Sequence, residues 1–284
     1  MVYKTEKKMK HARIFSMAAF ALAATLSMLP QRSAAQTLRG DFDMNGQVNI
    51  NDLTSLINCL LTDSPGEPEP GDYDTITVNG VPFVMVRVEG GIYRRKMGVH
   101  VSVETFSIGQ TEVTRELWTA IMGDDDPPFG GPDNPKRPVD AASLDDCLAF
   151  IDRLNELTGL TFRLPSWDEW LYAATGGKFT LSYNYAGSND LDQVAWYLNT
   201  VGNSLTARPV AQLAPNELHL YDMNGNVAEW SNEFYPLSDY GYTDQGELMG
   251  GSIISSQEQC YLNYSMVEKP CHERLYGRGF RLVL

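Results

Sequence analysis

The chain has 284 residues, a net charge of −14 and four cysteines. Proteins that bind nucleic acid or anionic membrane surfaces need basic patches, so an acidic chain of this kind is expected to bind neither. Four cysteines are too few for a disulfide scaffold in a chain of this length. The length suits one large domain with its own core and a small additional module.

Residues 1–35 have the pattern of a secretory signal peptide. Basic residues precede an apolar run from Ile14 to Leu29, and small residues at 33–35 supply a cleavage site. An uncleaved membrane anchor is the alternative, but the run is shorter than the ~20 residues that span a bilayer. We expect cleavage before Gln36, a secreted, periplasmic or cell-surface protein, and no membrane span in the mature chain. Loss of the basic segment makes the mature chain more acidic, which suits a protein that binds divalent cations.

A twelve-residue segment, 41–52, matches the ligand spacing of a calcium loop. Oxygen ligands occupy positions one, three, five, seven and twelve, a glycine makes the turn at six, and an apolar residue stands at eight. In order these residues are Asp41, Asp43, Asn45, Gly46, Gln47 (through its carbonyl), Val48 and Asp52. Apolar residues at helical spacing follow over 53–61. The alternative is an Asx-rich turn before an amphipathic helix, without a metal.

The aspartate at position twelve makes this segment similar to a dockerin repeat. A complete dockerin has two such repeats, and one is visible here. The resemblance implies either a component that docks into a larger extracellular assembly or a calcium-stabilised spacer. A stretch rich in proline, glycine and glutamate at 64–71 predicts a stiff, solvated linker. We therefore expect a small, helical, EF-hand-like module over 36–63 and a large domain over 72–284.

The large domain is expected to combine strands and helices. Loosely alternating apolar residues predict the strands, and N-cap residues and terminating glycines predict the helices. Ser166 and Glu169 form the pattern of a capping box. The expected elements are strands over 75–88 and helices over 116–122, 144–158 and 167–174. Regular patterns fade over 178–250, where glycine, asparagine, aspartate and tyrosine are frequent, so we predict an α+β fold with a loop-rich second half.

The segment 220–230 carries the strongest local signal in this half. Its Asn-Gly pair at 224–225 predicts a tight turn between two short strands. If the loop folds back, the carboxylates of Asp222 and Glu229 can converge with the carbonyls of Gly225 and Val227. Hard oxygen ligands of this kind are those that Ca²⁺ prefers. The alternative is a plain hairpin whose two acids face solvent.

This segment resembles the Gly-Leu-Tyr-Asp-Met-x-Gly-Asn-Val-Trp-Glu-Trp signature of the formylglycine-generating enzyme (sulfatase-modifying factor) family. His219 and Ala228 depart from the signature. Further pieces occur in the family's order at 111–114, 163–170, 250–252 and 279–282, so that the resemblance covers about residues 75 to 284. It implies a compact, loop-rich α+β fold like that of C-type lectins. It also implies calcium held by the carboxylates of Asp222 and Glu229 and the carbonyls of Gly225 and Val227.

The resemblance fails at the chemistry. The family's enzyme oxidises a sulfatase cysteine to formylglycine with Cu(I) held by two thiolates, which lie three and eight residues after the serine of Gly-Gly-Ser. Counted from Ser252, these positions hold Ser255 and Cys260. A serine hydroxyl is hard and uncharged at neutral pH, so it cannot replace a thiolate on Cu(I). Cys260 would be the catalytic cysteine of an active enzyme; otherwise it pairs with Cys271 as a disulfide or lies buried in the core.

We therefore expect an exported, calcium-binding protein whose large domain is non-catalytic and serves a binding or structural role, without a copper cofactor. One alternative is a copper-dependent formylglycine-generating oxidase, and another is a dockerin-like component of an extracellular assembly. The ligand is expected to be a protein or a glycan. Five aromatic residues are candidates for a sugar-binding surface, although in a tyrosine-rich chain core packing explains most of them: Trp196, Tyr197, Tyr235, Tyr240 and Tyr242.

Overall fold

A computed structural model describes residues 73–95, 98–123, 128, 134–202, 204–234, 245–268 and 271–284. The predicted signal peptide, calcium loop and linker lie outside these residues, as do Tyr235, Tyr240 and Tyr242. The expected mixture of strands and helices is confirmed within the described part of the chain.

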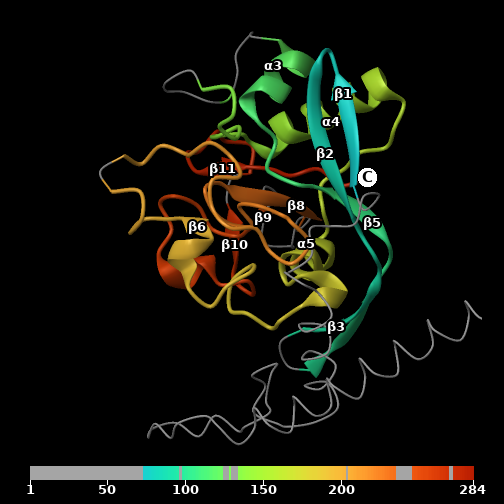
Figure 1. Ribbon diagram of the computed structural model, residues 1–284. Coiled ribbons are helices and arrows are strands. Elements are labelled where there is room, and N and C mark those ends of the chain that lie inside the picture. The colour runs from blue at the N-terminus through green and yellow to red at the C-terminus, as the bar shows by residue number, and fades with distance from the viewer. Residues whose placement is uncertain are drawn as a thin grey trace, which may run out of the picture.

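The first sheet is built on a long hairpin. Strands β1 (Tyr73–Val78) and β2 (Val81–Val88) pair antiparallel through a two-residue turn whose residues, Asn79 and Gly80, both have positive φ. Such a turn matches the right-handed twist of the strands that it joins. β2 also pairs with β5 (Phe106–Gly109). A second hairpin, β3 (Gly91–Arg94) with β4 (His100–Val103), lies at the end of the molecule away from helices α3 and α4 (Figure 1).

Three α-helices begin at hydroxyl caps. They are α3 (Arg115–Met122), α4 (Leu144–Thr158) and α5 (Trp167–Ala174), capped by Thr114, Ser143 and Ser166. The capping box expected at Ser166 and Glu169 is present, and Ser143 forms a second box with Asp146. Single turns of 3₁₀-helix follow at η2 (Gly177–Phe179), η3 (Leu191–Gln193) and η4 (Gln257–Cys260).

A second sheet occupies the middle of the molecule (Figure 1). Its strands are ordered β10 (Ser265–Glu268), β9 (Gly246–Met249), β8 (Ala228–Phe234) and β11 (Arg278–Gly279), with β11 parallel to β8. Long irregular segments connect the elements after α5, as the composition of 178–250 led us to expect.

The Asn-Gly pair does not form the hairpin turn that we expected. Asn224–Gly225 is itself strand β7, which pairs parallel with β6 (Ala195–Trp196). The buried Asn224 side chain accepts a hydrogen bond from the Ala186 amide (2.7 Å) and donates one to the Cys260 carbonyl (2.7 Å). A Cβ at Gly225 would collide with the Trp196 carbonyl, so a glycine is needed there. Tertiary hydrogen bonds and close packing therefore override the local turn preference.

The core consists of two large apolar clusters and a small one. In the first, Trp118 stacks on Phe150, and both meet the edge of Phe280, which joins α3 and α4 to the C-terminal segment. The second packs α5 against the first sheet and the residues that precede β7. Cys260 lies in the third, together with Tyr185 and Tyr197.

Candidate functional site

A buried ion pair lies at the centre of the signature segment. Arg281 Nη2 is 2.7 Å from Glu229 Oε1, and Arg281 Nε donates to both Glu229 oxygens at 3.1 and 2.9 Å. The two side chains are 0 % and 1 % exposed. Trp170 Nε1 donates to Glu229 Oε2 at 2.7 Å. Such a pair needs good geometry and further hydrogen bonds to offset the loss of hydration, and both are present here.

Arg281 also binds three backbone carbonyls from two separate segments. Its Nη1 donates to the carbonyls of Gly109 (2.8 Å) and Gln110 (3.1 Å), and its Nη2 donates to that of Tyr221 (2.8 Å). The end of β5, the signature segment and β8 are therefore held by one guanidinium group. Arg281 was not among the residues that we singled out from the sequence. The sequence does carry a signal for the burial of Arg281, because this charged residue stands between the apolar residues Phe280 and Leu282.

Two further acids lie in the same interior. The Asp222 carboxylate is 4 % exposed and accepts a hydrogen bond from the Ala211 amide (2.7 Å), while burial raises its pKa to about 6. Glu112 accepts hydrogen bonds from the Val227 amide (3.3 Å) and from Asn226 Nδ2 (3.1 Å). Burial, and then the charges of Asp222 and Glu229, raise the pKa of Glu112 well above its usual range. Because Glu229 is the acid paired with Arg281, burial favours the neutral form of the other two.

The structure brings Asp222, Gly225, Val227 and Glu229 into one region, but their groups do not fit a calcium ion in this arrangement. Each Glu229 oxygen accepts two hydrogen bonds, so neither has a lone pair left for a metal. Among the described residues, no group of three or more histidine, cysteine or acidic side chains is placed to hold a metal ion. Calcium at this loop stays a prediction from sequence, and it would require Arg281 to leave Glu229.

The two positions expected for copper ligands are buried beside Gly251. Ser255 is 6 % exposed, and its Oγ accepts a hydrogen bond from the Ser252 amide (2.9 Å). Cys260 is fully buried, and burial raises the pKa of its thiol to about 12. A Cβ at Gly251 would lie 2.9 Å from Cys260 Sγ, so the glycine allows this close approach. A hydroxyl bound to the backbone and a neutral thiol do not fit Cu(I), which needs soft thiolate ligands.

The disulfide alternative is wrong. Cys147, Cys260 and Cys271 are thiols, and Cys260 and Cys271 lie in different core clusters. The core interpretation of Cys260 agrees with its burial. Gly251 and Ser255 line a cavity of about 10 Å³, which holds at most one water molecule and is too small for a peptide side chain.

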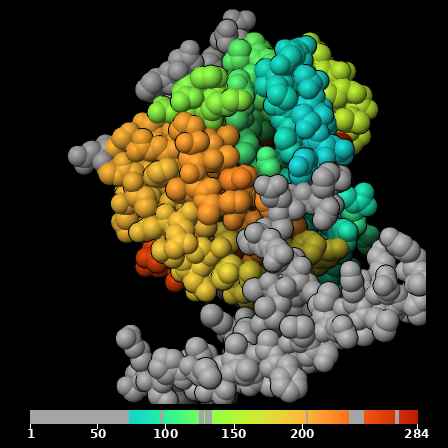
Figure 2. Space-filling model, in the orientation of Figure 1, coloured from blue at the N-terminus to red at the C-terminus, as the bar shows by residue number. Residues whose placement is uncertain are grey.

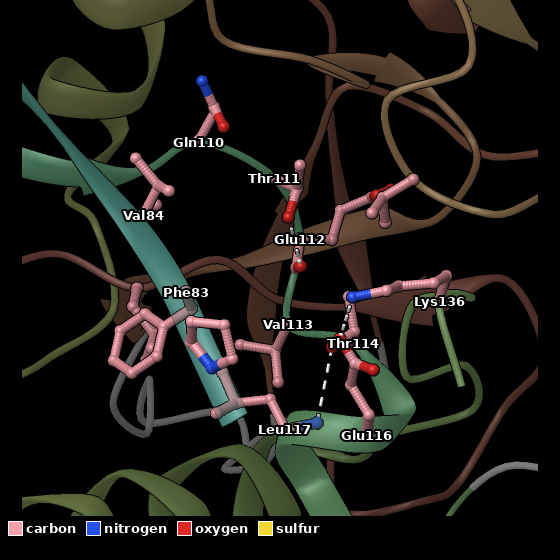
Figure 3. A pocket seen from close by; sticks show the side chains of 14 residues that line it. Phe83, Val84, Gln110, Thr111, Glu112, Val113, Thr114, Glu116, Leu117 and Lys136 are labelled. Carbon is pink, nitrogen blue, oxygen red and sulfur yellow. Dashed lines mark hydrogen bonds and ion pairs between the residues drawn. The ribbon is translucent and has the colours of Figure 1, made fainter. Parts of the chain in front are cut away.

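A larger cavity, of about 160 Å³, lies between β2 and the segment that leads into α3. Figure 2 shows the hollow between the β1–β2 hairpin and the orange segment that contains Val210. In Figure 3, Phe83 and Val84 face Val113 and Leu117 across it, and Lys136, paired with Glu116, lies at its other side. The walls are thus apolar on the side of β2 and polar toward Glu112.

Four exposed apolar side chains lie on segments that meet near Ser255. The Leu198 amide donates to the Ser255 carbonyl (3.2 Å), a Cβ at Gly277 would lie 3.5 Å from Ile254 Cδ1, and the Tyr276 hydroxyl donates to the Leu205 carbonyl. These side chains are between 43 % and 46 % exposed. We call this group the apolar rim, and it consists of Leu198, Leu205, Ile254 and Tyr276.

The two described members of the expected aromatic surface differ from each other. Tyr197 is buried, and its hydroxyl donates to Asp192 (2.6 Å), so core packing explains it. Trp196 is half-buried, and the Arg208 guanidinium lies 5.7 Å from its ring centroid.

Comparisons with known proteins identify the architecture. A family model described as the sulfatase-modifying factor enzyme 1-like domain matches residues 64–284 and thus begins where we expected the linker to begin. The chain is 28 % identical over 232 residues to the chaperone protein LppX of Paenibacillus barcinonensis, a match that covers 63 % of this chain and 82 % of that protein. It is 37 % identical over 78 residues to the serine/threonine-protein kinase Pkn1 of Chlamydia trachomatis, which is 28 % of this chain and 12 % of that kinase.

Solved structures share the fold. Treponema denticola variable protein 1 has a TM-score of 0.64 and 26 % identity, over 74 % of this chain and 98 % of that one. PvdO from Pseudomonas aeruginosa has a TM-score of 0.61 over 76 % and 99 % of the two chains, and at 18 % identity it shows the fold alone. In the described part of the chain, no helix has both the length and the apolar character needed to cross a membrane.

Proposed function

The chain belongs to the family of sulfatase-modifying factor enzyme 1-like domains, and from this premise we propose that it is a non-catalytic member that binds a protein partner. The observation that carries the proposal is the state of the two positions where the family's enzyme, by the resemblance, holds copper. Ser255 is bound to the backbone through its hydroxyl, and Cys260 is a buried thiol with a raised pKa. Cysteine oxidation by copper needs two thiolates, and these two positions hold a single cysteine.

The apolar rim supports a binding role. Apolar side chains that gather on a surface, rather than being scattered singly, indicate an interaction site. The rim adjoins Ser255, so the face that carries the chemistry in the enzyme carries apolar contact area here. The named role of the relative LppX, a chaperone, also concerns protein partners. A glycan is less well supported, because Tyr197 is buried in the core.

A Cu(I) competition titration on reduced protein tests the proposal. The wild type is expected to bind no Cu(I) tightly. Ser255→Cys places a second thiol five positions before Cys260 and should raise the Cu(I) affinity about tenfold or more, because two soft ligands replace one. Ser256→Cys is the matched control, since it adds a thiol at the neighbouring position, whose hydroxyl belongs to the cap of η4.

Two results would contradict the proposal. Tight Cu(I) binding by the wild type that is lost in Cys260→Ser would show that one cysteine suffices for a copper site. Equal affinities of Ser255→Cys and Ser256→Cys would show that Ser255 does not occupy the ligand position.

For residues 1–63 we propose export and a calcium-binding module, on the strength of the signal-peptide pattern and of the ligand spacing in 41–52. A role as a docking component is the second candidate, supported by the dockerin-like aspartate at position twelve. A pull-down with and without residues 36–63 separates these roles, because docking requires the segment and binding through the apolar rim does not.

A further inference from the structure

Two arginines lie opposite each other at the start of α3. Thr114 and Pro138 form an antiparallel bridge, the Arg115 amide donates to the Arg137 carbonyl (2.9 Å), and the Val139 amide donates to that of Val113 (2.8 Å). Arg115, the first residue of α3, and Arg137 are therefore the residues next to this bridge on the two segments. Like charges in such a position repel each other, and the Arg115 side chain is buried, with its Nε donating to the Pro138 carbonyl (3.4 Å).

The Arg137 guanidinium carries donors that nothing in the fold uses. Its Nε and Nη1 are buried and have no hydrogen-bond partner, and none of the ion pairs among the described residues includes Arg137. A buried charged donor without an acceptor is among the most costly arrangements in a folded protein. The position therefore indicates an acceptor that the described residues do not provide.

Asp140 lies beside this pair without neutralising Arg137. Its Oδ1 accepts a hydrogen bond from the Gly277 amide (2.6 Å), whereas its buried Oδ2 has no partner. Burial raises the pKa of Asp140, although hydrogen bonds and the Arg115 charge oppose this.

The apolar rim lies near this site through Tyr276. Arg137 is half-buried, and Tyr276 of the rim is 43 % exposed. Burial and then Asp140 raise the pKa of Tyr276, while the charges of Arg137 and Arg115 lower it, so all four side chains lie within electrostatic reach of one another.

We propose that Arg137, with Arg115 opposite it and Asp140 beside it, binds a tetrahedral oxyanion, a phosphate or sulfate group. Guanidinium donors suit the oxygens of such groups, and the Nε and Nη1 of Arg137 are the donors that would bind them. A phosphate or sulfate, which can carry two negative charges, gains more from the neighbouring charges of Arg137 and Arg115 than a carboxylate does. The inference goes beyond the proposed function and holds whether or not the apolar rim binds a protein. The oxyanion comes either from free phosphate or sulfate or from an ester on a larger ligand that also covers Tyr276.

The test is thermal unfolding of the full chain in the presence of inorganic phosphate, with the ionic strength held constant by chloride. An ion that binds the native state raises the melting temperature in a concentration-dependent way, which yields a Kd. Arg137→Gln should weaken phosphate binding at least tenfold. Arg153→Gln, which removes an exposed arginine elsewhere, should leave it unchanged. Asp140→Asn keeps an acceptor for the Gly277 amide and offers an amide donor, so it should bind phosphate at least as well as the wild type.

Phenyl phosphate and phenyl sulfate distinguish the two sources of the ion. Tighter binding of the esters than of phosphate supports a larger ligand that covers Tyr276, and equal binding supports a free ion. If Arg137→Gln does not fold, Arg137→Lys replaces it and should weaken binding at least threefold, because a lysine lacks the planar donor set. The proposal is overturned if neither phosphate nor sulfate shifts the wild-type transition, or if the Arg137 variant responds as the wild type does.

Discussion

Glu229 and Glu112 are both buried acids, but only Glu229 has a cationic partner. The Glu229 carboxylate accepts hydrogen bonds from Arg281 and Trp170, so its charge is fully compensated. Glu112 accepts hydrogen bonds from an amide and a side-chain amide, and burial raises its pKa. The same residue type is therefore paired with a cation in one position, whereas burial favours its neutral form in the other.

Replacement of each acid by glutamine should separate these two roles. Glu229→Gln leaves the Arg281 charge buried without a counter-ion and should lower the free energy of unfolding by about 3–5 kcal/mol. Glu112→Gln keeps a neutral side chain and loses one accepted hydrogen bond, so it should cost about 1 kcal/mol. Urea unfolding of both variants beside the wild type measures the difference. Equal losses in the two variants would contradict this assignment of charges.

The sequence could not reveal the pairing of Glu229 with Arg281, because the two residues are 52 positions apart and no local pattern joins them. The sequence predicted that Asp222 and Glu229 converge, and the two side chains do lie in one buried region. What sequence reasoning missed was the cation that occupies this region. That Ser255 and Cys260 do not form a pair of copper cysteines could be seen from the sequence, because it depends only on which residues stand at these two positions.

Among the elements, α4 shows how local signals fix a boundary and a tertiary contact strengthens it. Ser143 and Asp146 form the capping box, and Arg274 donates from Nε and Nη2 to the Asp146 carboxylate at 2.9 and 2.8 Å. Burial would raise the pKa of Asp146, but the hydrogen bonds from Arg274 and Ser143 outweigh it and lower the pKa below its usual range. The first turn of α4 is thereby tied to the C-terminal segment.

Asp146→Ala should therefore lower the free energy of unfolding at pH 7 by about 1–2 kcal/mol, through loss of the cap and of the ion pair. Because the folded pKa is lowered, the wild-type contribution of Asp146 is present above the unfolded pKa of about 3.9 and is lost as the pH falls further. The variant should then lose less stability than the wild type between pH 5 and pH 2. Chemical unfolding at a series of pH values measures both effects.

Asp145→Ala is the matched control, since Asp145 is the adjacent acid in the same turn and pairs with the exposed His272. A surface pair of this kind contributes about 0–1 kcal/mol. A loss at Asp145 as large as that at Asp146 would show that helix-terminal charge, rather than the capping box, stabilises α4.

Helices and short strands differed in how well the sequence predicted them. Caps and terminating glycines lie within a few residues of the helices that they bound, so α4 and α5 were predicted closely, and α3 within one residue at its start. β6 and β7 have two residues each and pair across 29 positions of chain. Their formation depends on the Asn224 side chain and on close packing at Gly225, which no periodic pattern reveals.

At the scale of the whole molecule, the expected calcium module and the large domain should behave as separate units, because a stiff linker at 64–71 is expected between them. Asp41→Ala with Asp43→Ala should remove one bound Ca²⁺ and leave the melting temperature of the large domain unchanged. Calcium titration by calorimetry, beside thermal unfolding, measures both quantities.

An unchanged calcium stoichiometry in this double variant would contradict the assignment of 41–52. A calcium ion that persists in the double variant and is lost on further Asp222→Asn substitution would instead place calcium at the signature segment. That result would require the Glu229–Arg281 pair to open on calcium binding.

The central claim is that this member of the family does not oxidise cysteine. Its most direct test is incubation of the reduced, copper-supplied wild-type chain with a cysteine-containing sulfatase peptide, followed by mass spectrometry of the peptide. With a hydroxyl at Ser255 and a buried neutral thiol at Cys260, we expect the peptide mass to stay unchanged. A peptide converted to formylglycine by the wild type, and not by Cys260→Ser, would contradict the claim.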